Sequence, residues 1–313
     1  MVTLTQLEYI VAVDTYRHFA TAAEKKFITQ PTLSMQIKKM EDELGVIIFD
    51  RSKQPIIPTD VGRKIIEQAR QVLFEANKIH RIIDDFQGEV SGTLKIGIIP
   101  TLTPYVLPLF IGEFSKKYPN IDIYVEEYYT HIIEEKLKKD QLDVGIVVTP
   151  LKDKNIHEDP LFYEEMKIFS HRGHPIARKQ TISVKDIASP DIWLLDDGHC
   201  FRTQVINLCR MKSQVQSKLP FHFDGGSLET IMKIVEREGG YTLIPELAAG
   251  FVPLTAPVIV RNFSDLTPLR EVSLIYARNF AKHKLISVLR EEIIQQVPKS
   301  LKNKARGTIV EWR

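Results

Sequence analysis

The 313-residue sequence contains only two cysteines, and they lie nine positions apart in the segment LLDDGHCFRTQVINLC. A cysteine reacts as the thiolate, which nearby positive charge or the amides of a helix N-terminus stabilise. His199, Arg202 and the preceding residues DDG, which are typical of a helix start, can supply these influences to Cys200. Cys209 instead has apolar neighbours. The pattern predicts a reactive thiol at Cys200 and a buried, inert thiol at Cys209.

The composition is typical of a soluble globular protein, with 43% apolar and 26% charged residues. The first residues, MVTLTQLEYI, resemble no secretory signal, and no apolar run approaches the roughly 20 residues that span a bilayer. We therefore expect a cytoplasmic protein, in which a structural disulfide is unusual and paired cysteines indicate metal binding, catalysis or redox sensing. The CxxC and HxxxH spacings of metal sites are missing, so we expect neither a metal nor a cofactor.

The net charge of +2 does not indicate a nucleic-acid-binding protein, so such a function must rest on the placement of charges. Residues 1–58 have the pattern of short helices. The segment QPTLSMQIKKMEDELG is predicted to be a helix, capped by Thr29, with Pro31 in its first turn and Gly45 at its end. Apolar residues at helical spacing predict its buried face: Leu33, Ile37, Met40 and Leu44.

The outer face of this helix and the segment after it carry the candidate DNA contacts. A tight turn joins the helix to the preceding one, HFATAAEKKF, in the helix-turn-helix pattern. The segment DRSKQPIIPT then has the pattern of a wing. The candidates on the two segments are Gln30, Pro31, Thr32, Ser34, Met35, Lys38, Arg51 and Lys53.

A long helix is predicted next, over about residues 59–87, with an apolar stripe from Ile65 to Phe86. A helix of this length spans roughly 43 Å, which exceeds the interior of a small domain, so we expect it to pair with a second chain. From Thr93 on, strands alternate with helices, which predicts a parallel sheet with helices on both faces. The final segment, PKSLKNKARGTIVEWR, is basic and is expected to be poorly ordered.

The segment FATAAEKKFITQPTLSMQIKKMEDELGVIIFDRS resembles the N-terminal domain of LysR-type transcription regulators, and the resemblance covers nearly the whole chain. It implies an α/β fold with a winged helix-turn-helix, a long linker helix and a two-lobed effector domain similar to periplasmic binding proteins. The implied bounds are 1–58 for the DNA-binding domain, 59–88 for the linker and dimerisation helix, 89–300 for the regulatory domain (lobe I about 89–162 and 267–300, lobe II about 163–266) and 301–313 for a basic tail.

Within that family, DDGHCFRTQVINLC resembles the redox loop of the peroxide-sensing members, and PTLTPYVLP, EEYYTHIIEEKL and LREVSLIYAR match the same members. The resemblance implies that Cys200 is the peroxidatic thiol and Cys209 its disulfide partner. It also implies a peroxide pocket lined by Thr101, Thr130, His199, Arg202 and Arg270. The implied partners are promoter DNA, hydrogen peroxide, RNA polymerase, and thioredoxin or glutaredoxin as reductant. A homodimer that assembles into a homotetramer is implied as well, with no membrane partner.

Helix geometry sets a condition on that disulfide. If residues 200–209 are helical, their terminal Cα atoms stand about 13 Å apart at 1.5 Å per residue. A disulfide needs the two Cα atoms within roughly 7 Å. Disulfide formation would therefore have to unfold or reorder this segment, which would make oxidation a conformational switch.

Three functions follow from these patterns. The first is a peroxide-sensing transcription regulator, which is not an enzyme. The second is a LysR-type regulator that binds a small metabolite between its lobes, with incidental cysteines. The third is a thiol peroxidase, which would leave the first 90 residues without a purpose and lacks a Pro-x-x-x-Thr-x-x-Cys motif before Cys200.

Overall fold

The computed structural model describes residues 1–87, 90–187, 191–209, 221, 223–277 and 282–312. The chain divides into two compact units, one that ends with the long helix of the N-terminal region and one that begins at Val90. Among the described residues, no helix has the length and apolar character needed to cross a membrane.

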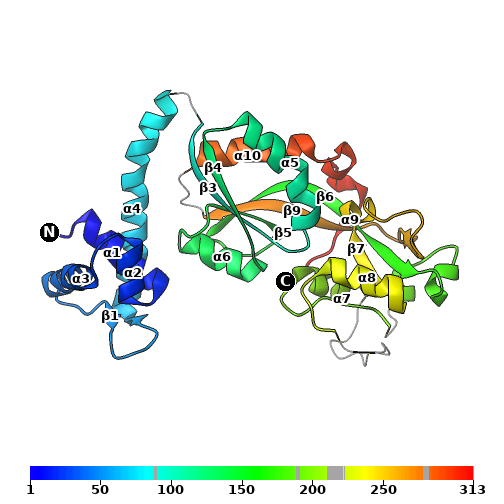
Figure 1. The fold of residues 1–313 in the computed structure, drawn as a ribbon, viewed down its shortest axis with the longest axis horizontal. Helices are drawn as coiled ribbons and strands as arrows, with labels where there is room; N and C mark the ends of the chain where they lie inside the picture. The colour runs from blue at the N-terminus through cyan, green and yellow to red at the C-terminus, as the bar shows by residue number, and fades with distance from the viewer. Residues whose placement is uncertain (88–89, 188–190, 210–220, 222, 278–281, 313) are drawn as a thin grey trace. The chain divides into compact units, whose positions relative to one another are not determined.

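The N-terminal unit contains three short helices, two very short strands and one long helix (Figure 1). Their bounds are α1 (Leu4–Tyr16), α2 (Phe19–Lys25), α3 (Gln30–Leu44), β1 (Phe49–Asp50), β2 (Ile57–Pro58) and α4 (Asp60–Gln87). Strands β1 and β2 pair antiparallel and form the predicted wing. The winged helix-turn-helix fold that the sequence predicted is therefore confirmed.

Helix α3 begins and ends at the predicted residues. The side chain of Thr29 accepts a hydrogen bond from the backbone N–H of Thr32, Pro31 lies in the first turn, and Gly45 ends the helix with a φ of 66°. A left-handed φ of this kind favours glycine, which has no Cβ to clash with the backbone. Three of the four predicted core residues are buried, and Leu44 is exposed because it is the last residue before the chain turns away.

The buried carboxylate of Glu41 joins α3 to the wing. Its Oε1 atom accepts hydrogen bonds from the backbone N–H groups of Ile48 at 2.8 Å and Phe49 at 3.3 Å. Its Oε2 atom pairs with Arg51 at 3.0 Å. Buried backbone N–H groups need a partner, so this one side chain supports the start of β1 as well as the wing arginine.

The first half of α4 packs on its own unit. Ile66 and Ala69 are buried in the N-terminal core, and Arg70 pairs with Asp14 of α1 at 3.0 Å. Further along, Ile79 is 65% exposed. The side chain of Phe86 and residues 88–89 lie outside the described part. Pairing of this helix with a second chain stays a prediction.

The C-terminal unit is built on an eight-stranded sheet with helices on both faces (Figure 1). The strands are β3 (Gly92–Ile98), β4 (Ile121–Glu127), β5 (Val144–Thr149), β6 (Ile156–His171), β7 (Tyr241–Pro245), β8 (Val258–Arg261), β9 (Pro268–Ala277) and β10 (Thr308–Ile309). The α-helices are α5 (Thr103–Lys117), α6 (Thr130–Lys138), α7 (Cys200–Cys209), α8 (Leu228–Glu238), α9 (Glu246–Ala249) and α10 (His283–Gln296). The main strand order is β4-β3-β5-β9-β6-β7, with β10 beside β9 and β8 beside β6.

The sheet is mixed, which corrects the prediction of a parallel sheet. Strands β4, β3 and β5 are parallel, whereas β9 runs antiparallel to both β5 and β6. The first part of β6 pairs with β9, and its second part pairs with β7 and β8. The chain thus crosses to the second lobe along β6 and returns along β9, and strands that run out and back are antiparallel.

The final segment is ordered, which corrects a second prediction. Strand β10 pairs with β9, and the indole of Trp312 donates to the carbonyl of Val148 at 3.2 Å. The side chains of Gln204 and Asn207 in α7 donate to the carbonyls of Val310 at 2.7 Å and Glu311 at 2.9 Å. The lysines and arginines suggested disorder, but the apolar residues among them have partners on the sheet.

Replacement of Glu41 by alanine is expected to lower the stability of the N-terminal unit by about 2–3 kcal/mol, because two buried N–H groups lose their acceptor. Hydrogen exchange of the backbone at Ile48 and Phe49 should rise in parallel. The matched control is Asp42→Ala, which removes an exposed carboxylate from the same helix. Equal exchange in the two variants would show that Glu41 does not support the wing.

Candidate functional site

The buried thiol of Cys200 has Thr130 and Arg270 around it, and Thr101 contacts Arg270. Cys200 is the first residue of α7, Thr130 is the first residue of α6, and Thr101 lies between β3 and α5. Arg270 comes from β9 and has no exposed surface. Thr101 and Thr130 follow the carboxyl ends of two neighbouring parallel strands, the edge at which α/β sheets place their ligand sites.

Arg270 is held by hydrogen bonds on two sides of its guanidinium group. Nη1 donates to the hydroxyl of Thr101 and Nη2 to the carbonyl of Thr101, both at 3.1 Å. Nε donates to Glu164 Oε1 at 2.7 Å, and Nη2 lies 2.5 Å from the same oxygen. The guanidinium carbon also stands 5.4 Å from the ring centre of Phe201, directly after Cys200. The cation is therefore fixed beside the first turn of α7.

The thiol of Cys200 lies in a polar setting inside an enclosed site. Burial raises the pKa of Cys200, while the charge of Arg270, the Thr130 hydroxyl and the backbone N–H groups of Phe201 and Cys200 itself act to lower it. Among the described residues, the Thr130 hydroxyl has no competing partner. The predicted helix-start amides are present, but burial outweighs them, so the protonated form of the thiol is favoured.

His199 and Arg202 have other contacts than the sequence suggested. His199 is buried against Tyr129, with ring centres 4.9 Å apart, and burial lowers its pKa, so its neutral form is favoured. Arg202 donates to the carbonyl of Leu195 at 2.7 Å and pairs with Asp197 at 2.7 Å. Arg202 thus holds the segment that leads into α7, and the cation that acts on the thiol is Arg270.

Cys209 lies at the other end of the same helix. The helix runs unbroken for ten residues, which meets the condition set in the sequence analysis, and both cysteines are free. Cys209 is packed in the apolar core of the second lobe, where burial raises its pKa to about 12. Both cysteines are 5% exposed. The two thiols therefore differ in their surroundings, which are polar at Cys200 and apolar at Cys209. They do not differ in solvent exposure, although the sequence suggested that they would.

Sequence reasoning missed Glu164 and Tyr129. Glu164 is fully buried in β6 as the partner of Arg270, and Tyr129 donates from its hydroxyl to Asp196 at 3.1 Å while it packs on His199. The available signal for Glu164 was an acidic pair inside the mostly apolar run LFYEEMKIF.

Among the described residues, no group of three His, Cys, Asp or Glu side chains is arranged to hold a metal ion.

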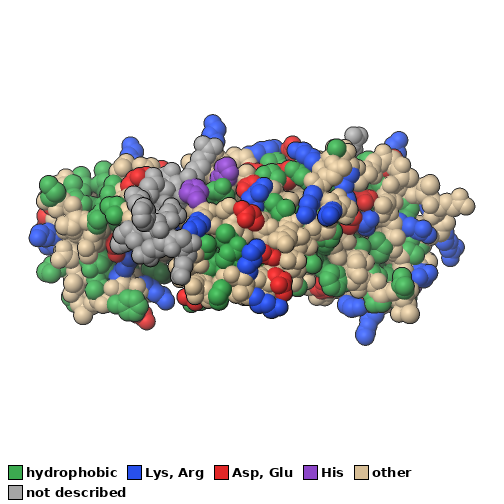
Figure 2. Space-filling view, turned by 90° about the horizontal axis from the view of Figure 1, so that it is seen from above, with side chains coloured by type: hydrophobic (Ala, Val, Ile, Leu, Met, Phe, Trp, Pro, Cys, Tyr) green, Lys and Arg blue, Asp and Glu red, His purple; other side chains and the backbone are tan. Residues whose placement is uncertain are grey.

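The candidate DNA contacts lie on the N-terminal unit. Lys38 and Lys53 are exposed, whereas Arg51 donates to the hydroxyl of Ser34 at 3.1 Å and pairs with Glu41. The outward Met35 is exposed as predicted. On the face drawn in Figure 2, basic side chains lie among acidic and apolar ones and do not form one broad patch. This distribution agrees with the small net charge.

Two family descriptions match the chain. Residues 4–63 match the bacterial regulatory helix-turn-helix protein, lysR family, and residues 87–298 match the LysR substrate binding domain. The hydrogen peroxide-inducible genes activator of Dickeya chrysanthemi is 36% identical over 274 residues, which cover 87% of this chain and 88% of that protein. The DNA-binding transcriptional dual regulator OxyR of Escherichia coli is 35% identical over the same shares.

Solved structures agree in fold over both units. A full-length OxyR variant from Pseudomonas aeruginosa has a TM-score of 0.78 at 33% identity and covers 95% of this chain and 99% of that chain. A hydrogen-peroxide-bound OxyR mutant from Corynebacterium glutamicum has a TM-score of 0.63 at 29% identity, with coverage of 94% and 92%. Taken with the buried thiol site and the winged helix-turn-helix, these matches show that the chain belongs to the LysR family of bacterial helix-turn-helix regulators.

Proposed function

We propose that this chain is a hydrogen-peroxide-sensing transcriptional regulator that binds promoter DNA through residues 1–58. The observation that carries the proposal is the setting of Cys200, whose thiol meets a hydroxyl donor, helix-start amides and a buried arginine. Relatives at 35–36% identity carry the names hydrogen peroxide-inducible genes activator and OxyR, which supports the same function.

The chemistry would proceed in two balanced steps. The Cys200 thiolate attacks one peroxide oxygen, the O–O bond breaks, and the departing hydroxide takes a proton to become water. Thr101, Thr130 and Arg270 can donate hydrogen bonds to the two oxygens during this step. The thiol of Cys209 then attacks the resulting sulfenic acid, so an S–S bond forms and a second water leaves. Thioredoxin or glutaredoxin would restore both thiols.

The second step requires α7 to come apart. Its ends are about 13 Å apart by helix rise, and a disulfide tolerates roughly 7 Å. Unwinding also removes the bonds from Gln204 and Asn207 to the final segment of the chain. The altered surface would then change how the protein contacts DNA and RNA polymerase. The protein would act as a homodimer that assembles into a homotetramer, in which the exposed part of α4 pairs with a second chain.

A metabolite-binding regulator is the second candidate, because the match over residues 87–298 is named a substrate binding domain. Brief exposure to peroxide, followed by thiol titration and mass mapping, separates the candidates. A sensor loses two thiols and gains one Cys200–Cys209 bond, a metabolite-binding regulator loses none, and a peroxidase turns over continuously with reductant.

The two cysteine variants are expected to fail at different steps. Cys200→Ser should lose the peroxide response and keep DNA binding, because the polar surroundings belong to this thiol alone. Cys209→Ser should consume one equivalent of peroxide and stop at the sulfenic acid, which mass spectrometry detects. A peroxide-dependent change in the DNA footprint of Cys200→Ser would reject Cys200 as the sensor.

The reaction of Cys200 with peroxide is expected to accelerate with pH. Burial raises the pKa of this thiol, so the thiolate is the minor form near neutral pH and its fraction grows as the pH rises. Stopped-flow kinetics of the Cys209→Ser variant measures this slope. The matched variant Thr130→Val removes a group that lowers the pKa, so its profile should move to higher pH. A flat profile in both would contradict a protonated resting thiol.

The Lys38→Ala variant is expected to bind DNA more weakly and to lower the salt slope of the affinity by about one, as loss of one phosphate contact does. The control is Lys302→Ala, an exposed lysine of the other unit. Binding isotherms at several salt concentrations give both slopes, and identical slopes would remove Lys38 from the interface.

A further inference from the structure

Glu164 is the buried carboxylate that faces Arg270. The two residues lie directly opposite each other in the antiparallel pair of β6 and β9, so their side chains project to the same face of the sheet. Neither has any exposed surface. The Arg270 guanidinium contacts the Glu164 carboxylate through one oxygen. Both Nε and Nη2 of Arg270 lie within hydrogen-bond distance of Glu164 Oε1.

The contacts of Glu164 decide which way the guanidinium fork points. A guanidinium group is planar, so fixing the edge formed by Nε and Nη2 also fixes the direction of Nη1. In this structure Nη1 then reaches the hydroxyl of Thr101, which is a residue of the thiol site. A lysine, or an arginine without its carboxylate partner, would have no such constraint.

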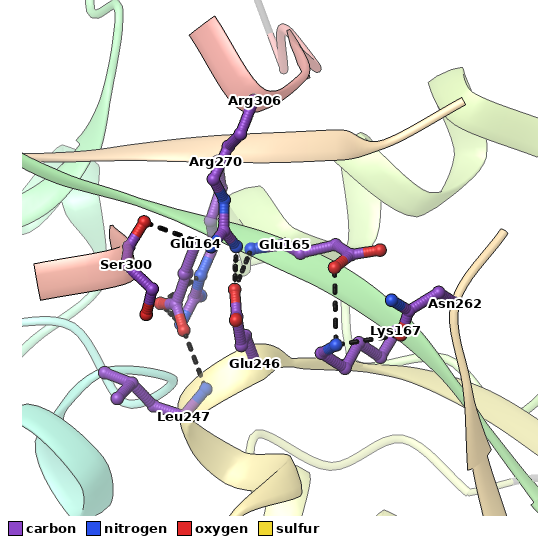
Figure 3. A network of polar contacts seen from close by, with 9 residues as sticks. All are labelled: Glu164, Glu165, Lys167, Glu246, Leu247, Asn262, Arg270, Ser300 and Arg306. Atoms are coloured by element: carbon purple, nitrogen blue, oxygen red, sulfur yellow. Dashed lines mark hydrogen bonds and ion pairs between the residues drawn. The ribbon is translucent and has the colours of Figure 1, made fainter. Parts of the chain in front are cut away.

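Glu164 is itself supported by a second layer of polar contacts (Figure 3). Its Oε2 atom accepts from the backbone N–H of Leu247 at 3.2 Å. The next residue, Glu165, donates its N–H to Glu246 at 3.1 Å, and Glu246 also pairs with Arg306 of the final segment. The carboxylate therefore sits on a backbone that is tied to two other elements, which limits its movement.

We propose that Glu164 is a positioning residue of the thiol site, which aims the Arg270 guanidinium at Thr101 and balances part of its positive charge beside Cys200. The proposal rests on the proposed function, in which the Cys200 thiolate attacks peroxide. Glu164 touches neither thiol nor peroxide in this arrangement and acts through Arg270 alone. It therefore has two separable effects, one of direction and one of charge.

Two substitutions separate these effects. Glu164→Gln keeps an acceptor for Arg270 but removes the negative charge, so the sulfur experiences the full cation and its thiolate is favoured. Glu164→Asp keeps the charge but shortens the side chain by one methylene, so the Arg270 guanidinium is no longer held in the orientation that directs Nη1 to Thr101. The control is Glu165→Gln, whose side chain pairs with Lys167 and not with Arg270.

The titratable groups around the site allow a clean readout. They are Glu164 and Arg270 from the sheet, His199 ahead of α7 with Asp196 and Glu127 near it, and Tyr105 of α5 with Glu229 of α8 beside it. Burial raises the pKa of Tyr105 and lowers that of His199, so neither changes charge in mildly alkaline solution. The ultraviolet absorbance of a Cys209→Ser chain, minus that of a chain that also carries Cys200→Ser, then reports the Cys200 thiolate without any peroxide, because tyrosine ionisation is common to both chains.

The experiment titrates Cys200 in the full chain with each substitution and measures the peroxide rate constant across the same pH range. We expect Glu164→Gln to move the titration midpoint down by about one pH unit, and the rate constant at neutral pH up by as much as about tenfold. We expect Glu164→Asp to leave the midpoint near that of the parent and to lower the rate at every pH. The Glu165→Gln control should match the parent in both.

Failure of this inference differs from failure of the proposed function. Midpoints and rates of Glu164→Gln and Glu164→Asp that superimpose on the parent, in chains with native circular dichroism, would overturn the role of Glu164. If Glu164→Gln does not fold, a Glu164→Asp rate equal to that of the parent is enough to overturn it. A parent Cys200 that titrates but does not react with peroxide would overturn the proposed function, while the midpoints still decide the role of Glu164.

Discussion

The rise of one α-helix is the constraint on which the thiol chemistry depends. Cys200 and Cys209 occupy the two ends of α7, so the helix and a bond between the two sulfurs exclude each other. Apolar packing of Phe201, Val205 and Cys209 favours the helix and therefore the separated thiols. Any event that joins the sulfurs would have to remove this packing, so the proposed disulfide would make the helix a two-state element.

A second constraint is the burial of a full positive charge in the antiparallel pair of β6 and β9. A buried arginine is tolerated only where hydrogen bonds and a counter-charge replace its lost water. Glu164 and Thr101 supply these, and they come from β6 and from the loop after β3. The electrostatics of the thiol site therefore depend on the sheet that joins both lobes, and not on the segment around the cysteines alone.

The final segment shows how the two constraints are connected. It adds β10 to the edge of β9, close to the position of Arg270 in the same strand, and it accepts hydrogen bonds from Gln204 and Asn207 of α7. Arg306 of the same segment contacts Glu246, whose other partner is the backbone beside Glu164. One stretch of chain thus contacts both α7 and the residues that support the buried ion pair.

The sequence alone determined the local features, because each depends on neighbours within a few residues: the cap at Thr29, the helix end at Gly45, the wing, and a helix that starts at Cys200. The family resemblance added Thr101, Thr130 and Arg270 to the site. Only the tertiary structure decided which cation faces the thiol, since Arg202 is two residues away in sequence yet bonds to the preceding loop, whereas Arg270 arrives from a distant strand. It also revealed Glu164, the mixed sheet and the ordered final segment, because charge balance and strand direction are set by long-range contacts that local pattern does not encode.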